Sequence, residues 1–362
     1  MKKYFIMAVA VLATLTACQP DEPQTTIVET REISFAPAAT QTRATAVDET
    51  TTENLGDFAV WGYVGANGNF TSAVFSKTTV TKTATNTSDF SATSKAVWQP
   101  VGGDVKYWAP NSTYWFSAMY PLSEAGKYSF STDGTTHIQK ITAFAIAEGG
   151  VSTKDIVVAR PAKATLGNEQ QRPAVGLTFD HMLARVRFAF RNGFADKNVT
   201  IEITNVELNG LIAQADATIA SDGKAAWNNS TDNIKLDFQD KNDIFTLENN
   251  SIGEAVEEDT VATQYRLFIP TSVVENAYKL SFDLVVKADN VTVLSKSYTM
   301  DVDDDPNNDA VGLKAVEYEN GKSYLFSATI NGNLLNEEIF PINFDVTVTD
   351  WAADQYMGDI FE

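Results

Sequence analysis

The chain has 362 residues with 47 acidic and 27 basic side chains, which gives a formal net charge of −20 at pH 7. This acidic balance, without a basic patch among aromatic residues, excludes nucleic acid as an expected partner. Two histidines and one cysteine exclude an internal disulfide and leave too few ligands for a four-ligand zinc site, so we expect no cofactor.

Residues 1–18 have the features of a lipoprotein signal peptide. Two lysines precede an apolar core from Tyr4 to Leu15, which is too short to remain as a transmembrane helix. The core ends in Leu15-Thr16-Ala17-Cys18, a lipobox in which small residues fit the peptidase and the thiol accepts a diacylglycerol. We expect acylated Cys18 to anchor the exported precursor to outer-membrane lipid. The alternative is an ordinary secretory signal with a chance cysteine.

Residues 19–43 are expected to form a tether followed by one isolated strand. The segment up to about Thr30 is rich in Pro, Glu and Thr, which is typical of a flexible linker. Ile33-Ser34-Phe35 then alternates apolar and polar residues, as a short strand does. Pro37 and a polar loop rich in Thr and Ala follow.

The body is predicted to be β-strand almost throughout. Its Val, Thr, Phe and Tyr residues fit a pleated, half-buried surface, and no helical periodicity persists for three turns. The predicted strands are 58–64, 114–120, 155–159, 184–190, 199–208, 265–269, 280–286, 291–300, 324–330 and 344–348, with a Thr-rich edge hairpin at 71–87. Residues 163–176 lack periodicity, which indicates a boundary between domains. We therefore expect an all-β fold of two β-sandwich domains in series, 44–170 and 171–351.

No catalytic motif is present in the sequence. The nucleophile elbow, the zinc-protease helix, the phosphate loop and the dinucleotide glycines are all absent, so we expect no enzyme. His181 is predicted to be structural, with its ring bonded to local backbone. Two carboxylates from distant strands would suffice for a glycosidase, which leaves a secreted hydrolase as one alternative function.

An acidic run between predicted strands offers oxygen ligands for calcium at Asp301, Asp303, Asp305 and Asp309. It fails as an EF-hand loop, because Pro306 stands where glycine is required and Gly312 where the closing glutamate is required. We favour a solvated acidic loop over a weak calcium site.

Two aromatic pairs, Tyr107-Trp108 and Tyr114-Trp115, have rings that could stack on sugars. We favour a role in the sandwich core, since the pairs lie within alternating strands. Rings exposed on one face would instead support the other alternative function, a glycan-binding surface lipoprotein.

Several segments in order resemble the fimbrillin family of Bacteroidota, the subunits of type V pili. The likeness covers nearly the whole chain and rests on Cys18 and on residues 33–35, 42–44, 58–64, 177–188, 206–211, 319–324 and 346–351. This resemblance implies a transthyretin-like pilin architecture and a structural subunit of an adhesive surface fimbria.

The resemblance also implies an assembly mechanism. An arginine-specific protease would cut between Arg43 and Ala44, which frees the strand Ile33-Ser34-Phe35 and opens a groove. A segment of another pilus subunit would fill this groove by strand addition. In this chain the donor would come from residues 352–362, whose apolar residues are Tyr356, Met357, Ile360 and Phe361. A cut at Arg31 would leave the strand attached. The presence of both features favours a stalk subunit over a tip or an anchor.

Overall fold

The computed structural model describes residues 32–39, 55–66, 69–83, 97–109, 112–165, 174–194, 198–228, 233–239, 243–248, 260–270, 278–303, 312–314, 317–331 and 342–351. In these residues every regular element is a β-strand except one short 3-10 helix, η1 (Ala125–Lys127). The predicted all-β fold is therefore confirmed. No helix within these ranges is long and apolar enough to cross a membrane.

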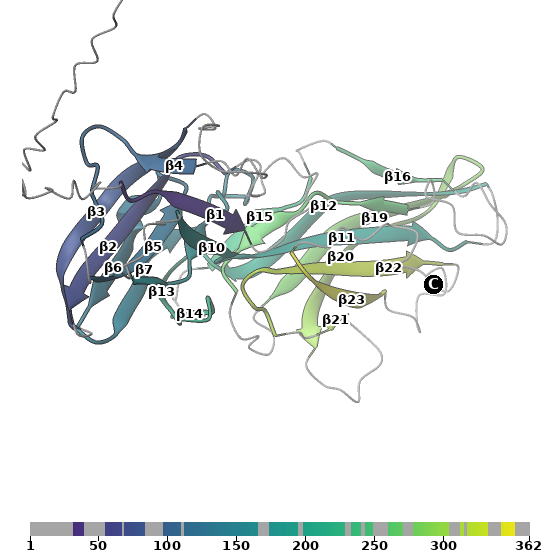
Figure 1. Ribbon diagram of the computed structural model, residues 1–362. Coiled ribbons are helices and arrows are strands. Elements are labelled where there is room, and N and C mark those ends of the chain that lie inside the picture. Colours follow the sequence, from purple (N-terminus) through teal and green to yellow (C-terminus); the bar gives the residue numbers. More distant parts are fainter. Residues whose placement is uncertain are drawn as a thin grey trace, which may run out of the picture.

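The described strands form two lobes, which Figure 1 shows side by side. The N lobe holds an eight-stranded and a four-stranded sheet, and the C lobe holds an eleven-stranded sheet. The eight-stranded sheet contains, in spatial order, β2 (Phe58–Ala66), β3 (Asn69–Thr83), β4 (Val97–Pro100), β1 (Phe35–Ala39), β10 (Val175–His181), β8 (Val157–Ala159), β5 (Thr113–Tyr120) and β9 (Ala162–Thr165). The four-stranded sheet contains β14 (Ala225–Trp227), β13 (Gln214–Ile219), β7 (His137–Ala145) and β6 (Tyr128–Thr132).

The sheet of the C lobe has more strands, and two of its strands pair outside the main strand order. It contains, in spatial order, β15 (Asn233–Asp237), β12 (Val199–Ile212), β19 (Lys279–Ala288), β20 (Val291–Asp303), β21 (Gly312–Lys314), β23 (Asn343–Asp350), β22 (Lys322–Ile330), β11 (Ala184–Asn192) and β17 (Thr260–Ala262). β16 (Phe245–Leu247) pairs with β12, and β18 (Arg266–Phe268) pairs with β11.

Seven strands of the eight-stranded sheet close on themselves. β2 pairs with β5 as well as with β3, so the path from β2 through β3, β4, β1, β10, β8 and β5 returns to β2. We call this closed path the ring. Its interior is one of two buried apolar clusters and includes Phe35, Phe58 and Phe116. β1 is thus one of the strands that close the ring.

The four-stranded sheet packs against the outside of the ring. Along β2, Phe58 and Val60 point into the ring, whereas Ala59 and Trp61 belong to the second apolar cluster with Tyr128 of β6. This strand is therefore buried on both faces, which explains its near-continuous run of apolar residues.

A buried polar network joins the two sheets of the N lobe. Gln139 of β7 donates hydrogen bonds to the hydroxyls of Tyr128 (2.7 Å) and Ser117 (2.9 Å). Ser117 of β5 in turn donates to the carbonyl of Ala159 at 2.8 Å. Burial raises the pKa of the Tyr128 hydroxyl, which stays protonated. Because breaking any of these bonds would leave buried polar atoms unpaired, the network holds the two sheets in one alignment.

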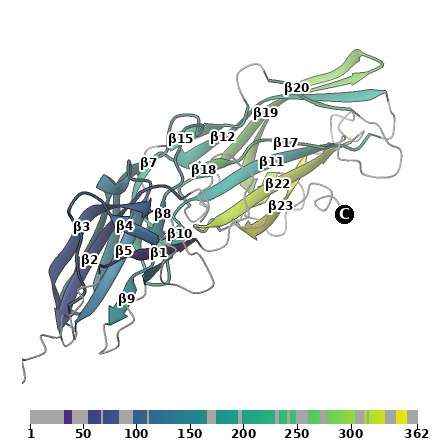
Figure 2. The same cartoon turned by 45° about the horizontal axis from the view of Figure 1, so that its top comes forward.

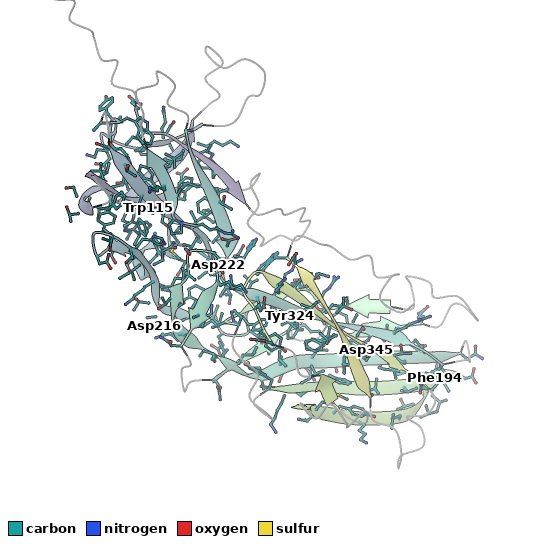
Figure 3. All side chains as sticks on the ribbon, turned by 60° about the horizontal axis from the view of Figure 1, so that its bottom comes forward. Trp115, Phe194, Asp216, Asp222, Tyr324 and Asp345 are labelled. Carbon is teal, nitrogen blue, oxygen red and sulfur yellow. The ribbon has the colours of Figure 1, made fainter. Side chains whose placement is uncertain are left out.

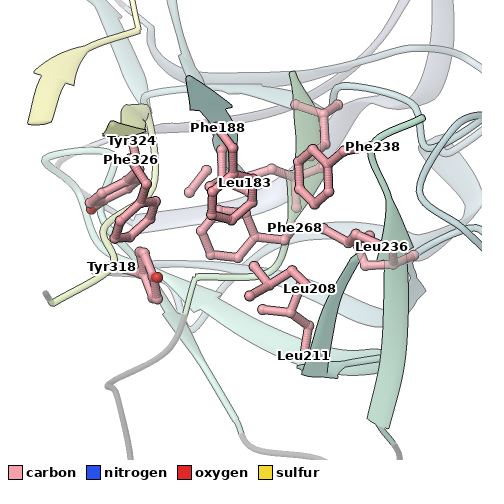
Figure 4. Packing of buried hydrophobic residues seen from close by; sticks show 14 of the residues in the cluster. Leu183, Phe188, Leu208, Leu211, Leu236, Phe238, Phe268, Tyr318, Tyr324 and Phe326 are labelled. Carbon is pink, nitrogen blue, oxygen red and sulfur yellow. The ribbon is translucent and has the colours of Figure 1, made fainter. Parts of the chain in front are cut away.

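The core of the C lobe combines aromatic rings with aliphatic side chains (Figure 4). Phe188 of β11 meets Phe238 edge-on, with ring centroids 4.9 Å apart, and stacks on Phe326 of β22 at 5.6 Å. The strand predicted at 184–190 is confirmed as β11, and its residues Val186, Phe188 and Phe190 are fully buried in this core.

The chain crosses between the lobes three times. β10 lies in the N lobe and continues into β11 of the C lobe. β12 then leads back to β13, which pairs with β7 of the N lobe, and to β14, which pairs with β13, before the chain returns at β15. The boundary expected near residue 170 lies between β9 and β10, both of which belong to the eight-stranded sheet.

The hairpin predicted at residues 71–87 is wrong. β3 is instead one strand of 15 residues that pairs with β2 on one edge and β4 on the other. Its threonines suit a strand as well as a turn, and the composition alone does not distinguish the two.

The absence of a side chain at Gly62 of β2 leaves room for two aromatic rings inside the ring of strands. A Cβ at this position would lie 2.8 Å from the ring of Phe116 and 3.2 Å from that of Phe75. We expect Gly62→Val to lower the free energy of unfolding by about 1–3 kcal/mol through overpacking, measured by urea denaturation. Gly176→Val is the control, since nothing lies within 4 Å of a Cβ there. Equal losses in both variants would contradict this account of Gly62.

Candidate functional site

The strongest candidate site is the position of β1 in the ring, which we call the β1 slot. β1 runs parallel to β10 over five residue pairs, from Phe35 beside Val175 to Ala39 beside Phe179. On its other edge it pairs with β4 only where Phe35 meets Trp98. Just before β1, the amide of Ile33 donates to the carbonyl of Lys106 at 2.8 Å. Figures 1 and 2 show β1 beside β10 near the junction of the lobes.

The hydrogen bonds of β10 show which of its backbone groups depend on β1. On the edge facing β8, Thr178 accepts from the amide of Arg160 and the amide of Met182 donates to Ile156. On the other edge, the amide of Val175 donates to the carbonyl of Ser34 at 2.8 Å. Since successive residues of a strand bond to alternate edges, Val175, Leu177 and Phe179 direct both of their backbone groups at β1.

Pro37 lies in β1 without interrupting this ladder. In the same register the even-numbered residues of β1 bond to β10, so the missing N–H of Pro37 faces away from β10. The sequence predicted a strand of residues 33–35 followed by Pro37, whereas β1 begins at Phe35 and continues through Pro37 to Ala39. Its extension past the proline is possible because proline is tolerated where a strand needs no donor on that edge.

Ile33 and Phe35 plug the interior of the ring, and both are fully buried. The ring of Phe35 meets those of Phe75 and Phe116 edge-on, with centroids 5.8 and 5.6 Å apart. Ser34, between them, is only partly buried. Phe35 begins β1, and Ile33 and Ser34 directly precede it, so the three predicted residues alternate between buried and partly buried and supply two apolar anchors.

Most of the other predicted site residues lie outside the described part of the chain. These are Cys18, Arg43, Ala44, Asp305, Asp309, Tyr356, Met357, Ile360 and Phe361. Asp301 and Asp303 lie at the end of β20. In the backbone register of the sheet, Asp301 lies opposite Lys279 of β19 and Asp303 beside Lys314 of β21. Among the described residues no group of three His, Cys, Asp or Glu side chains could hold a metal ion.

His181 is buried at the end of β10, and its partner differs from the one predicted. Its Nδ1 lies 2.9 Å from Oδ2 of Asp155, a side chain, rather than bonding local backbone. Its ring stacks on Trp351, with centroids 4.3 Å apart and an interplanar angle of 7°. The sequence offered no signal for this contact, because the three residues come from distant segments.

Trp351 is held from several sides. Its amide donates to Gly321 at 2.9 Å, and its carbonyl accepts from Nη2 of Arg185 at 3.0 Å. The guanidinium of Arg185, which is buried, lies 5.4 Å from the Trp351 ring and 4.0 Å from that of Tyr265. Residue 351 is thus fixed at the end of β10, where the lobes meet.

The predicted aromatic pairs are mostly core residues. Trp108 and Tyr114 are buried in the ring, with centroids 4.9 Å apart. Trp115, labelled in Figure 3, is partly buried beside His137 and Phe70. Tyr107 is 50% exposed, but it is the one exposed ring of the four. These positions give no support to a sugar platform.

A hollow of about 740 Å³ lies between the lobes, at the level of Asp222 in Figure 3. Its wall includes Asp222, Glu317 and Trp351, together with two ion pairs. Arg160 makes two bonds of 2.6 and 2.9 Å to Asp180, and Lys322 bonds Asp350 at 2.6 Å. Trp351 and Tyr318 are too deeply buried to offer a ring face to a ligand. Each ion pair lies within one lobe, Arg160 with Asp180 in the N lobe and Lys322 with Asp350 in the C lobe.

Comparison with known proteins connects this architecture to a family. A family model described as fimbrillin-like matches residues 42–351. Among solved structures, a fimbrial protein from Bacteroides vulgatus ATCC 8482 is similar with a TM-score of 0.52 and 15% identity, over 89% of this chain and 100% of that one. The fimbrial anchor protein Mfa2 from Porphyromonas gingivalis aligns with a TM-score of 0.34 and 9% identity, over 90% of this chain and 100% of that one.

No curated protein sequence matches the chain significantly. The match to the family model nevertheless covers well over half of its length, from just before Arg43 to Trp351. The chain belongs to the fimbrillin-like family.

Proposed function

We propose that this chain is a non-enzymatic structural subunit of an adhesive surface fimbria and polymerises by strand exchange at the β1 slot. The precursor is exported and held in the outer membrane by lipid on Cys18. An arginine-specific protease cuts between Arg43 and Ala44, and residues 352–362 of another subunit take the place of β1.

The observation that carries this proposal is the way β1 closes the ring. Arg43 follows β1 in the sequence, so one cut after it separates β1 from the rest of the chain. Its loss would leave the amides and carbonyls of Val175, Leu177 and Phe179 facing an empty slot. Each such group costs about 1–3 kcal/mol if it stays buried without a partner.

The two apolar anchors add to this driving force. Ile33 and Phe35 are fully buried, and burial of such a side chain is worth about 1.5–3 kcal/mol. An incoming strand that fills both positions and pairs with β10 would recover these contributions. Such a joint between subunits is expected to dissociate slowly.

Removal of residues 352–362 is expected to abolish assembly. The test compares purified residues 44–362 with residues 44–351, using SDS-resistant ladders on gels as the measure of polymer. The longer protein should form ladders and the shorter one should stay monomeric, because its open slot receives no donor. The uncut precursor is the control and should also stay monomeric. Equal ladders from both processed forms would show that residues 352–362 are not the donor.

A further inference from the structure

We propose that residues 352–362 can also enter the β1 slot of their own molecule, so that a processed subunit caps itself before it assembles. This inference rests on the proposed function, because it requires that the slot be emptied and that this segment be able to fill it. It adds a competing intramolecular state to the exchange between subunits.

The first support is the place where the segment starts. Trp351 stacks on His181, the last residue of β10, and β10 is the strand that forms one wall of the slot. Asn320 strengthens this junction by donating from Nδ2 to the carbonyl of His181 at 2.8 Å. Trp351, the last described residue before the segment, is therefore in contact with the slot's own strand, at the end where Phe179 lies.

The second support is reach. Phe35 lies beside Val175, six residues before His181, and so its pocket is about 20 Å from the stacked Trp351 at 3.3 Å per residue. The pocket of Ile33 lies two residues farther, at about 26 Å. Tyr356 is the fifth residue after Trp351 and Phe361 the tenth, which extend to about 17 and 33 Å. The segment is thus long enough to pass both pockets, and Met357, the sixth residue after Trp351, would lie at the distance of the Phe35 pocket.

The third support is that the segment can make the required bonds. Residues 352–362 contain no proline, so each of them offers an N–H as well as a carbonyl. Starting at His181, the segment would run antiparallel to β10, whereas β1 runs parallel to it. Either face of the extended segment carries two apolar side chains, Tyr356 with Ile360 or Met357 with Phe361.

Self-capping has a consequence for assembly. A donor attached to its own acceptor acts at an effective concentration of about millimolar, well above that of free subunits in dilute solution. The processed monomer would therefore hide its open slot until the local concentration of subunits is high. Polymerisation then requires one subunit's segment to leave its own slot before another's can enter.

Hydrogen exchange in dilute monomers tests this proposal. Residues 44–362 and 44–351 are compared at concentrations where mass photometry finds only monomers, and exchange is followed at the amides of Val175, Leu177 and Phe179. We expect these amides to exchange about ten-fold or more slowly in the longer protein, because only it carries the capping segment. The protection should not change on further dilution, as befits an intramolecular contact.

Equal exchange in the two monomers would overturn self-capping. A synthetic peptide of residues 352–362, added to residues 44–351, separates this failure from that of the proposed function. If the peptide protects β10 while the longer monomer does not, the segment is a donor between molecules only. If the peptide does not protect β10 either, the donor role of residues 352–362 fails as well.

Discussion

Replacing Phe35 with alanine in the uncut precursor is expected to lower the free energy of unfolding of the N lobe by about 3–5 kcal/mol. The side chain is fully buried and meets Phe75 and Phe116, so its truncation leaves a cavity in the ring. The neighbouring rings are fixed by their own strands and by the close approach of Gly62, which limits their collapse into the space. The measurement is the shift of the urea midpoint at constant slope.

Ser34→Ala is the matched control for this substitution. Ser34 directly precedes β1, and it contributes to the ladder through its carbonyl, which alanine retains. We expect a change within about 0.5 kcal/mol. If Phe35→Ala were as mild as Ser34→Ala, β1 would not be a strand that fills the ring, and the energetic basis of strand exchange would be lost.

Blocking the cut at Arg43 should abolish assembly altogether. An Arg43→Gln precursor treated with an arginine-specific protease is expected to keep β1 in its slot and to form no SDS-resistant ladder. The strand is held by its ladder to β10 and by two buried side chains, and while it remains attached to the chain it competes at high effective concentration.

The control for this experiment is Arg31→Gln. Arg31 precedes β1, so a cut there leaves the strand connected to the rest of the chain. This variant should be processed at Arg43 and should assemble like the wild type, as judged by N-terminal mass spectrometry and by gels. Ladders from the Arg43→Gln protein would mean that the slot opens without this cut.

The sequence predicted where the strands lie better than it predicted which strands pair with one another. The alternation in residues 184–190 and the aromatic run in residues 114–120 predicted two strands correctly, because each pattern is local. The pairing of β1 with β10 joins residues about 140 positions apart, and nothing local in either strand specifies it. For the same reason the return of β13 and β14 to the N lobe was not foreseen.

The candidate site was predictable in part. Ile33 and Phe35 stood out because an apolar alternation was isolated by polar segments on both sides. Pro37 concealed the rest of β1, since the effect of a missing donor depends on which edge of the strand it faces. The cluster of Trp351, His181 and Arg185 left no trace in the sequence, because it is assembled from three separate strand ends.

The three crossings between the lobes have a mechanical consequence. A fibre that is pulled lengthwise would load each subunit through its junction, and a single linker there would stretch first. Here the load divides among the chain between β10 and β11, between β12 and β13, and between β14 and β15. Because one apolar cluster also continues from the N lobe into the C lobe, separating them would expose buried surface at the same time. Each subunit should therefore transmit tension as a stiff rod rather than as two beads on a string.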